Sequence, residues 1–242
     1  FPVMIKFFKP TVITSLLTLF CINGMAQKGS ELLIQANRAT LERNYEKAIN
    51  LYGEYIDHNK DDFRGYFNRG TTEYNAKRFD DAIRDFTKTI ALNPTYKEAY
   101  YYRGMCLVEL NKFSEAIKDY TLVLEKDPSS VPFLKLRSET YAKMGNNNLA
   151  LADLDLALEI EKLSGDLYKR RAELKVVMKD IHGAVKDYSS VEKLIPNYKM
   201  VHYIKGNLYL KLEENELACE EFQKALDNGI VVADKAYLLH CK

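Results

Sequence analysis

Apolar residues recur along this chain with a fixed period of 34 positions. The stretch RFDDAIRDFTKTIALNP, Arg78 to Pro94, is followed 34 places later by the closely similar KFSEAIKDYTLVLEKDP, Lys112 to Pro128. In both stretches the apolar residues lie three or four positions apart, which is the spacing of an amphipathic helix. A period of this length is typical of chains built from stacked copies of one small unit. The pattern therefore predicts an all-α repeat protein.

Three columns of residues define six copies of the unit, with no insertion between them. The first column is alanine: Ala48, Ala82, Ala116, Ala150, Ala184 and Ala218. Twelve places earlier stands a small residue: Ala36, Gly70, Gly104, Ser138, Ala172 and Gly206. Four places after the alanine stands a large side chain: Tyr52, Phe86, Tyr120, Leu154, Tyr188 and Phe222. Small residues allow two helices to cross closely, so each copy should be a helical hairpin whose apolar faces are buried by stacking on the next copy.

The unit resembles the tetratricopeptide repeat (TPR). The likeness lies in aromatic residues at positions 4 and 17 of the unit, a small residue at position 8, alanine at position 20 and proline at position 32. Beyond the columns above, it is carried by Tyr66, Tyr100, Tyr168, Tyr45, Phe79, Phe113, Pro94, Pro128 and Pro196. The resemblance covers about residues 29–230, and it implies a right-handed α-solenoid of six hairpins.

The ends of the chain differ from the repeats. Residues 1–26 combine basic residues, the apolar run TVITSLLTLFCI and small residues before Gln27, which is the layout of a cleaved signal peptide. The alternative is an uncleaved membrane anchor. The repeats then occupy residues 27–230, and residues 231–242 should form a capping helix with Val232, Ala236 and Leu239 on one face. We therefore expect an exported protein, periplasmic or secreted.

Removal of the signal would leave three cysteines, and an odd number cannot be fully paired within one chain. Cys106 and Cys219 fall inside helical repeats, where a small buried apolar side chain is expected. The sequence leaves open whether Cys106, Cys219 and Cys241 are free or paired.

A column of charges runs through the copies. The basic residues are followed 16 places later by acids, which gives the pairs Arg69 and Asp85, Arg103 and Asp119, Arg137 and Asp153, and Arg171 and Asp187. A basic row along a groove would suit anion binding. Acids at a constant spacing instead favour structural ion pairs between the two helices of each hairpin.

Composition and spacing argue against catalysis and against most ligand classes. The chain is 47% apolar and 29% charged, and its 35 basic residues nearly balance its 34 acidic ones, so no charge excess favours nucleic acid or a membrane surface. The histidines His58, His182, His202 and His240 lack a second ligand three or four places away, so the spacing suggests no metal site. The sequence has no phosphate-binding loop or nucleophile motif, so we expect no enzyme, no cofactor and no small-molecule substrate.

The resemblance implies that the first helix of each hairpin lines a concave groove, through positions 2, 5, 9, 12 and 13 of the unit. The candidate partner-binding residues are Phe67, Thr71, Tyr74, Asn75, Tyr101, Met105, Glu109, Lys135, Glu139, Lys169, Glu173, Tyr203 and Asn207. The early copies offer aromatic side chains and the later ones offer charges. Family members that bind an acidic chaperone tail use a clamp of bases and asparagines. Asn37 and Asn68 match the asparagines, but Leu33, Glu98 and Tyr102 replace the three bases, so no such clamp is expected.

Together these observations predict a non-catalytic scaffold that binds a peptide or protein segment in its groove. Contact with a membrane is expected only if the N-terminal segment is not cleaved. The alternative is a structural subunit of a bacterial envelope assembly, which would use its outer face or associate with itself.

Overall fold

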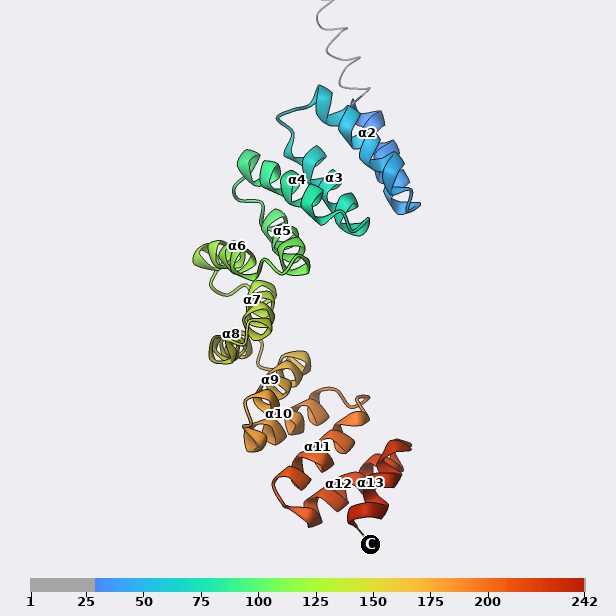
Figure 1. Cartoon of the computed structure of the whole chain (residues 1–242), viewed down its shortest axis with the longest axis vertical. Helices are drawn as coiled ribbons and strands as arrows, with labels where there is room; N and C mark the ends of the chain where they lie inside the picture. Colours follow the sequence, from blue (N-terminus) through green and yellow to red (C-terminus); the bar gives the residue numbers. More distant parts are fainter. Residues whose placement is uncertain (1–28, 242) are drawn as a thin grey trace, which may run out of the picture. The chain divides into compact units, whose positions relative to one another are not determined.

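The computed structural model describes residues 29–241, and the predicted signal segment lies outside them. The described part of the chain is helical throughout apart from its short connections (Figure 1). Residues 29–41 are helical and precede α2. The helices that follow are α2 (Tyr45–His58), α3 (Phe63–Asn75), α4 (Phe79–Leu92), α5 (Lys97–Glu109), α6 (Phe113–Lys126), α7 (Val131–Lys143), α8 (Asn147–Ile160), α9 (Gly165–Val177), α10 (Ile181–Leu194), α11 (Met200–Lys211), α12 (Asn215–Asp227) and α13 (Val232–His240).

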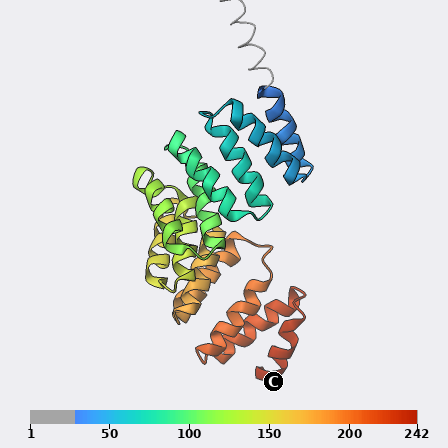
Figure 2. The same ribbon diagram turned by 45° about the horizontal axis from the view of Figure 1, so that its top comes forward.

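The fold is an all-α helical-repeat solenoid, as predicted. The chain divides into two compact units after Glu115, within α6. Inside each unit, helices that are consecutive in sequence pack side by side, as α11, α12 and α13 do in Figure 2. No helix among the described residues is both long enough and apolar enough to cross a bilayer.

The turns between paired helices repeat with the same period as the sequence. The second helices α2, α4, α6, α8, α10 and α12 begin 34 residues apart. Just before each of them one residue adopts a positive φ, at Arg43, Lys77, Asn111, Gly145, Lys179 and Glu213. The left-handed conformation ends the first helix and reverses the chain. Only one copy has glycine at this position, so the period of the fold does not depend on a glycine signal.

The small residues of the repeat lie where the two helices of a hairpin cross. In the first unit, a Cβ added to Gly70 would lie 2.9 Å from the ring of Phe86. Phe86 also stacks on Tyr102 of the next hairpin, with ring centroids 5.7 Å apart. The second unit repeats the crossing, because a Cβ on Gly206 would lie 2.5 Å from the ring of Phe222. The large side chain therefore packs against its own hairpin and, at Phe86, against the next one as well.

The C-terminal helix corrects two predictions. Val232 and Leu239 are exposed, and α13 instead packs through Ala233, which is fully buried, with Ala236 and Tyr237 half-buried. Cys219 is not a buried apolar side chain, because it forms a disulfide with Cys241 that ties the end of α13 to α12. The crosslink and the close approach at alanine set which face of α13 points inward. Cys106 is buried and free, as expected for a core residue.

Candidate functional site

The predicted ion pairs join the two helices of a hairpin. Arg137 Nε and Nη2 donate to the two carboxylate oxygens of Asp153 at 2.9 and 2.7 Å. Arg69 pairs with Asp85 at 2.6 and 2.8 Å, and Arg171 pairs with Asp187 at 2.8 and 2.7 Å. The three acids are buried. In these copies the guanidinium groups bind a carboxylate of their own hairpin, which is a structural role.

The remaining pair, Arg103 with Asp119, joins residues of the two units and stays a prediction. Within its own unit, Arg103 donates to the hydroxyl of Thr87 at 3.0 Å.

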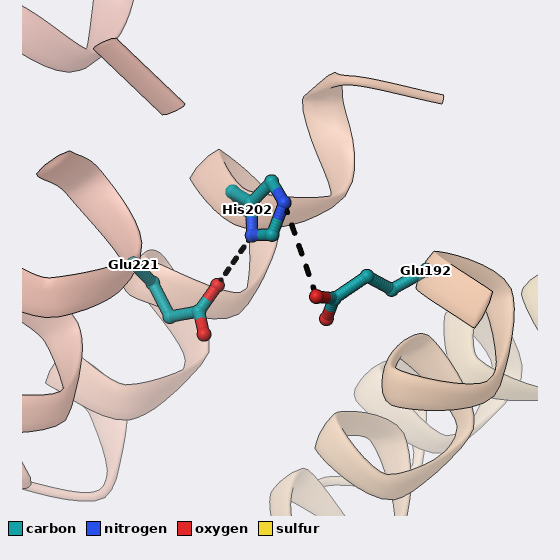
Figure 3. A group of neighbouring side chains, drawn as sticks. All are labelled: Glu192, His202 and Glu221. Carbon is teal, nitrogen blue, oxygen red and sulfur yellow. Dashed lines mark hydrogen bonds and ion pairs between the residues drawn. The ribbon is translucent and has the colours of Figure 1, made fainter. Parts of the chain in front are cut away.

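In the sixth copy the same column holds Lys205 and Glu221, and their ion pair is part of a larger cluster on α10, α11 and α12 (Figure 3). His202 Nδ1 lies 2.7 Å from Glu221 Oε2, and its Nε2 lies 4.0 Å from Glu192 Oε1. Lys205 Nζ donates to Glu192 at 2.8 Å and to Glu221 at 3.1 Å. Burial alone would raise the pKa of Glu221, but hydrogen bonds from His202, Lys224 and Lys205 hold it below its usual value.

Glu192, His202 and Glu221 are residue types that can bind a metal ion, and their donor atoms lie within 4.8 Å of one another. Two observations argue against that role. The two carboxylates face opposite nitrogens of the imidazole ring (Figure 3). The ammonium group of Lys205 already bridges both carboxylates, and a metal ion bound to both of them would have to displace it. The cluster is therefore a structural clamp between the fifth and sixth copies.

Two hollows open on the first helices of the second unit. Hollow 1 encloses about 370 Å³ and is lined by Ser138, Glu139, Ala142, Lys143, Leu154, Arg170, Glu173, Leu174 and Val177. Hollow 2 encloses about 310 Å³ and is lined by Glu173, Val176, Tyr188, Tyr203, Ile204, Asn207, Leu208 and Lys211. They adjoin, because Glu173 on α9 lines both. Four of the predicted groove residues, Glu139, Glu173, Tyr203 and Asn207, thus come together on α7, α9 and α11.

The other predicted groove residues of the second unit are held in ion pairs beside these hollows. Lys135 Nζ donates to Asp166 at 2.6 Å, and Arg170 also donates to Asp166, at 3.0 Å. Arg170 contacts Glu139 as well. Lys169 lies 4.0 Å from Glu173 and above the ring of Tyr198, at 4.8 Å from its centroid.

The predicted groove residues of the first unit lie on α3 and α5, and their aromatic rings take part in packing. Phe67 contacts the rings of Phe86, Tyr96 and Tyr102 at centroid distances of 4.9 to 5.9 Å. Tyr74 contacts Phe79 and Tyr102. Burial raises the pKa of the Tyr74 hydroxyl. Both rings are half-buried, as are Thr71, Tyr101 and Met105, whereas Asn75 and Glu109 are exposed.

The sequence reasoning missed several residues that shape the hollows. Ala142, Lys143, Val176, Val177 and Lys211 occupy positions 12 and 13 of the unit, which the resemblance places in the groove but which were not singled out. In the cluster of the sixth copy, the contacts of His202 and Glu192 were missed because the residues of the cluster come from three helices. Its signal was three departures at repeat positions: His202 in place of tyrosine, Lys205 in place of arginine and Glu192 in place of isoleucine or leucine.

Sequence models of the tetratricopeptide repeat match residues 36–86, 67–131 and 201–228. The chain belongs to the tetratricopeptide repeat family. Proteins of this family are in general non-catalytic scaffolds for protein interactions. The matched segments include α3, α5 and α11, which carry many of the candidate groove residues.

Two curated relatives are similar in sequence to part of this TPR protein. It is 33% identical over 69 residues to the small glutamine-rich tetratricopeptide repeat-containing protein 2 of Saccharomyces cerevisiae, across 28% of this chain and 20% of the yeast protein. It is 39% identical over 80 residues to DnaJ homolog subfamily C member 7 of Homo sapiens, across 31% of this chain and 16% of the human protein. The likeness thus spans a fifth or less of either relative.

Solved structures share the fold at low sequence identity. The C-terminal part of a TPR protein from Cytophaga hutchinsonii matches with a TM-score of 0.71 at 17% identity, over 81% of this chain and 78% of that one. MamA from Desulfovibrio magneticus matches at 0.65 and 18% identity, over 71% and 97% of the two chains. YrrB, described as a TPR protein with an unusual peptide-binding site, matches at 0.61 and 21% identity, over 76% and 96%.

Proposed function

We propose that this TPR protein is a non-catalytic scaffold that binds a peptide or protein segment on the first helices of its repeats. The observation that carries the proposal is the pair of adjoining hollows on α7, α9 and α11. Their walls combine apolar side chains such as Leu154, Leu174 and Leu208 with a few charged groups. A concave, mostly apolar surface with a few polar groups is the usual form of a binding site. Nucleic acid and small-molecule substrates are not part of the proposal.

The proposal is tested by asking whether a single substitution in hollow 1 prevents the protein from capturing a partner. The bait is residues 27–242, incubated with the envelope fraction of its own cells. Val177 lines hollow 1 and is 67% exposed, so Val177→Arg should block the hollow without loss of folding. Leu163, in the connection before α9, is 81% exposed and lines neither hollow, so Leu163→Arg is the matched control. A partner captured by the control and lost with Val177→Arg supports the proposal, and a partner retained by both contradicts it.

A second candidate function is that of a structural subunit that associates through its cap. Val231, Val232, Leu238 and Leu239 are 82%, 54%, 47% and 71% exposed, which leaves apolar surface on and beside α13. Surfaces of this kind often mark interfaces. Sedimentation of the wild type and of the double variant Leu238→Gln and Leu239→Gln tests this candidate. This candidate function requires that the wild type sediments as an oligomer and that the double variant sediments as a monomer.

We also propose that the protein is exported, to the periplasm or beyond the cell, with an uncleaved N-terminal anchor as the alternative. The disulfide between Cys219 and Cys241 supports export, because disulfides persist in oxidising compartments and are rare in the cytosol. The expected mature N-terminus is Gln27. Edman sequencing of the protein purified from its own cells checks this, and a chain that begins at Met4 in the membrane fraction would contradict it.

A further inference from the structure

Glu173 occupies a special place between the two hollows. It is the residue that lines both of them, and 55% of its side chain is exposed. In its ion pair with Lys169, 4.0 Å separates Oε1 of Glu173 from Nζ of Lys169. The ammonium group of Lys169 lies over the ring of Tyr198 at the same time. The charge of Glu173 also acts on Arg170 in the wall of hollow 1, but Arg170 donates its hydrogen bonds to Asp166 and Glu139. Among the described residues, the carboxylate of Glu173 is therefore neutralised only at a distance.

The neighbouring acids are held more tightly. Asp166 accepts from Lys135 at 2.6 Å and from Arg170 at 3.0 Å, and Glu139 contacts Arg170 directly. An exposed carboxylate with a distant cation gains more from an added positive charge than one that is already paired. Glu173 is thus the best place on this face for a cation from a partner.

The surroundings of Glu173 are apolar on both sides. Leu174 and Val177 line hollow 1, whereas Val176 and Leu208 line hollow 2. The charge of Glu173 also acts on hollow 2. Burial raises the pKa of Tyr188 in its wall to about 12, and the carboxylate of Glu173 adds to that shift. A negative charge between two apolar depressions suits a ligand with a positive charge between two apolar groups.

We propose that the second unit binds a partner segment in which one lysine or arginine stands between two apolar side chains. The base pairs with Glu173, and the apolar side chains enter hollows 1 and 2. Basic side chains also line the hollows, Lys143 and Arg170 in the first and Lys211 in the second, so a segment that is basic throughout would be repelled. This inference rests on the proposed function, because it names the partner chemistry of the same groove.

A random dodecapeptide library displayed on phage tests the inference without knowledge of the natural partner. Selection on residues 27–242 should enrich peptides with one lysine or arginine flanked by apolar residues. A synthetic peptide of that consensus should bind Glu173→Lys at least about tenfold more weakly than the wild type, because the pair becomes a repulsion. Glu159→Lys is the matched control, since Glu159 is an exposed acid on α8 that lines neither hollow. Its affinity should stay at the wild-type value.

The outcomes separate this inference from the proposed function. The inference is overturned if the selected peptides lack the base, or if they bind Glu173→Lys as well as the wild type. If Val177→Arg still blocks these peptides, the groove remains the binding site. Peptides that bind regardless of Val177→Arg overturn both. A peptide in which norleucine replaces the base of the consensus should bind the wild type more weakly than the consensus peptide does. On Glu173→Gln the two peptides should bind with equal affinity. Equal loss on both proteins would also overturn the inference.

Discussion

At the scale of the residue, backbone conformation outweighs side-chain contact at the repeat turns. Gly145 has φ +79°, and a Cβ there would meet nothing within 4 Å. Gly145→Ala should therefore destabilise the protein by about 1 kcal/mol through backbone strain alone. Gly53→Ala lies inside α2 with ordinary contact to Arg69 at 3.7 Å, and it should stabilise by about 0.5 to 1 kcal/mol. Urea unfolding of the two variants measures both values, and equal effects would refute the distinction.

One buried acid makes the stability of the first unit depend on pH. Glu73 is 5% exposed, and its Oε2 has no hydrogen-bond partner among the described residues. Burial raises its pKa to about 7, and the nearby carboxylate of Asp85 adds to the shift. The folded state holds the proton of Glu73 more tightly than the unfolded state, so protonation of Glu73 adds to the free energy of unfolding. This contribution is complete below pH 4.5 and is lost as the pH rises through 7.

Glu73→Gln removes the ionisation and keeps the size of the side chain. The variant should resemble the wild type at pH 5 and should be about 1 to 3 kcal/mol more stable at pH 8. Urea midpoints at the two pH values provide the measurement. A gain of the same size at both values would show that the effect does not come from the charge.

Single residues also show where sequence reasoning stops. The columns at Gly70 and Phe86 were readable, because each recurs six times and serves the same crossing. Leu239 was assigned to the wrong face, because α13 occurs once and its rotation is set by the disulfide and by Ala233. His202 could not be placed with Glu192, because residues of three helices meet only after folding.

At the scale of the element, the ion pairs fix one helix of a hairpin to the other. The carboxylate of Asp153 is buried and accepts two hydrogen bonds from Arg137, which also donates to Thr121 at 3.1 Å. Asp153→Ala should cost about 3 kcal/mol of unfolding free energy, because it leaves a half-buried guanidinium without its acid. Glu159→Ala, on the exposed side of the same helix, should change it by less than about 0.5 kcal/mol. Similar losses in the two variants would contradict the structural role.

The element scale was the most predictable from sequence. The 34-residue period predicted where each second helix begins, because a helix boundary that recurs six times averages out local ambiguity. The hollows were predicted only in part. Glu173 and Tyr203 were chosen by their groove positions, whereas Val177 was overlooked because an apolar residue in a repeat is expected to be core.

At the scale of the whole molecule, two surfaces are candidates for binding a partner. The first-helix face carries hollows 1 and 2, and the cap carries exposed apolar residues on α13. The 34-residue period explains why the helices stack. It does not indicate which of the two surfaces binds a partner, because both surfaces result from the same stacking. The central claim is therefore that the first-helix face is the binding surface.

Photo-crosslinking tests this claim most directly. Benzoylphenylalanine is placed, in separate proteins, at Val177 in hollow 1, at Leu156 on the exposed side of α8 and at Leu239 on the cap, all of which are at least 39% exposed. Each protein is irradiated with the partner captured from the cell envelope, and the products are compared by mass spectrometry. Crosslinks to the partner from position 177 and not from position 156 or 239 are the predicted result. Crosslinks from position 156 or 239 alone would contradict the claim and would favour the structural-subunit function.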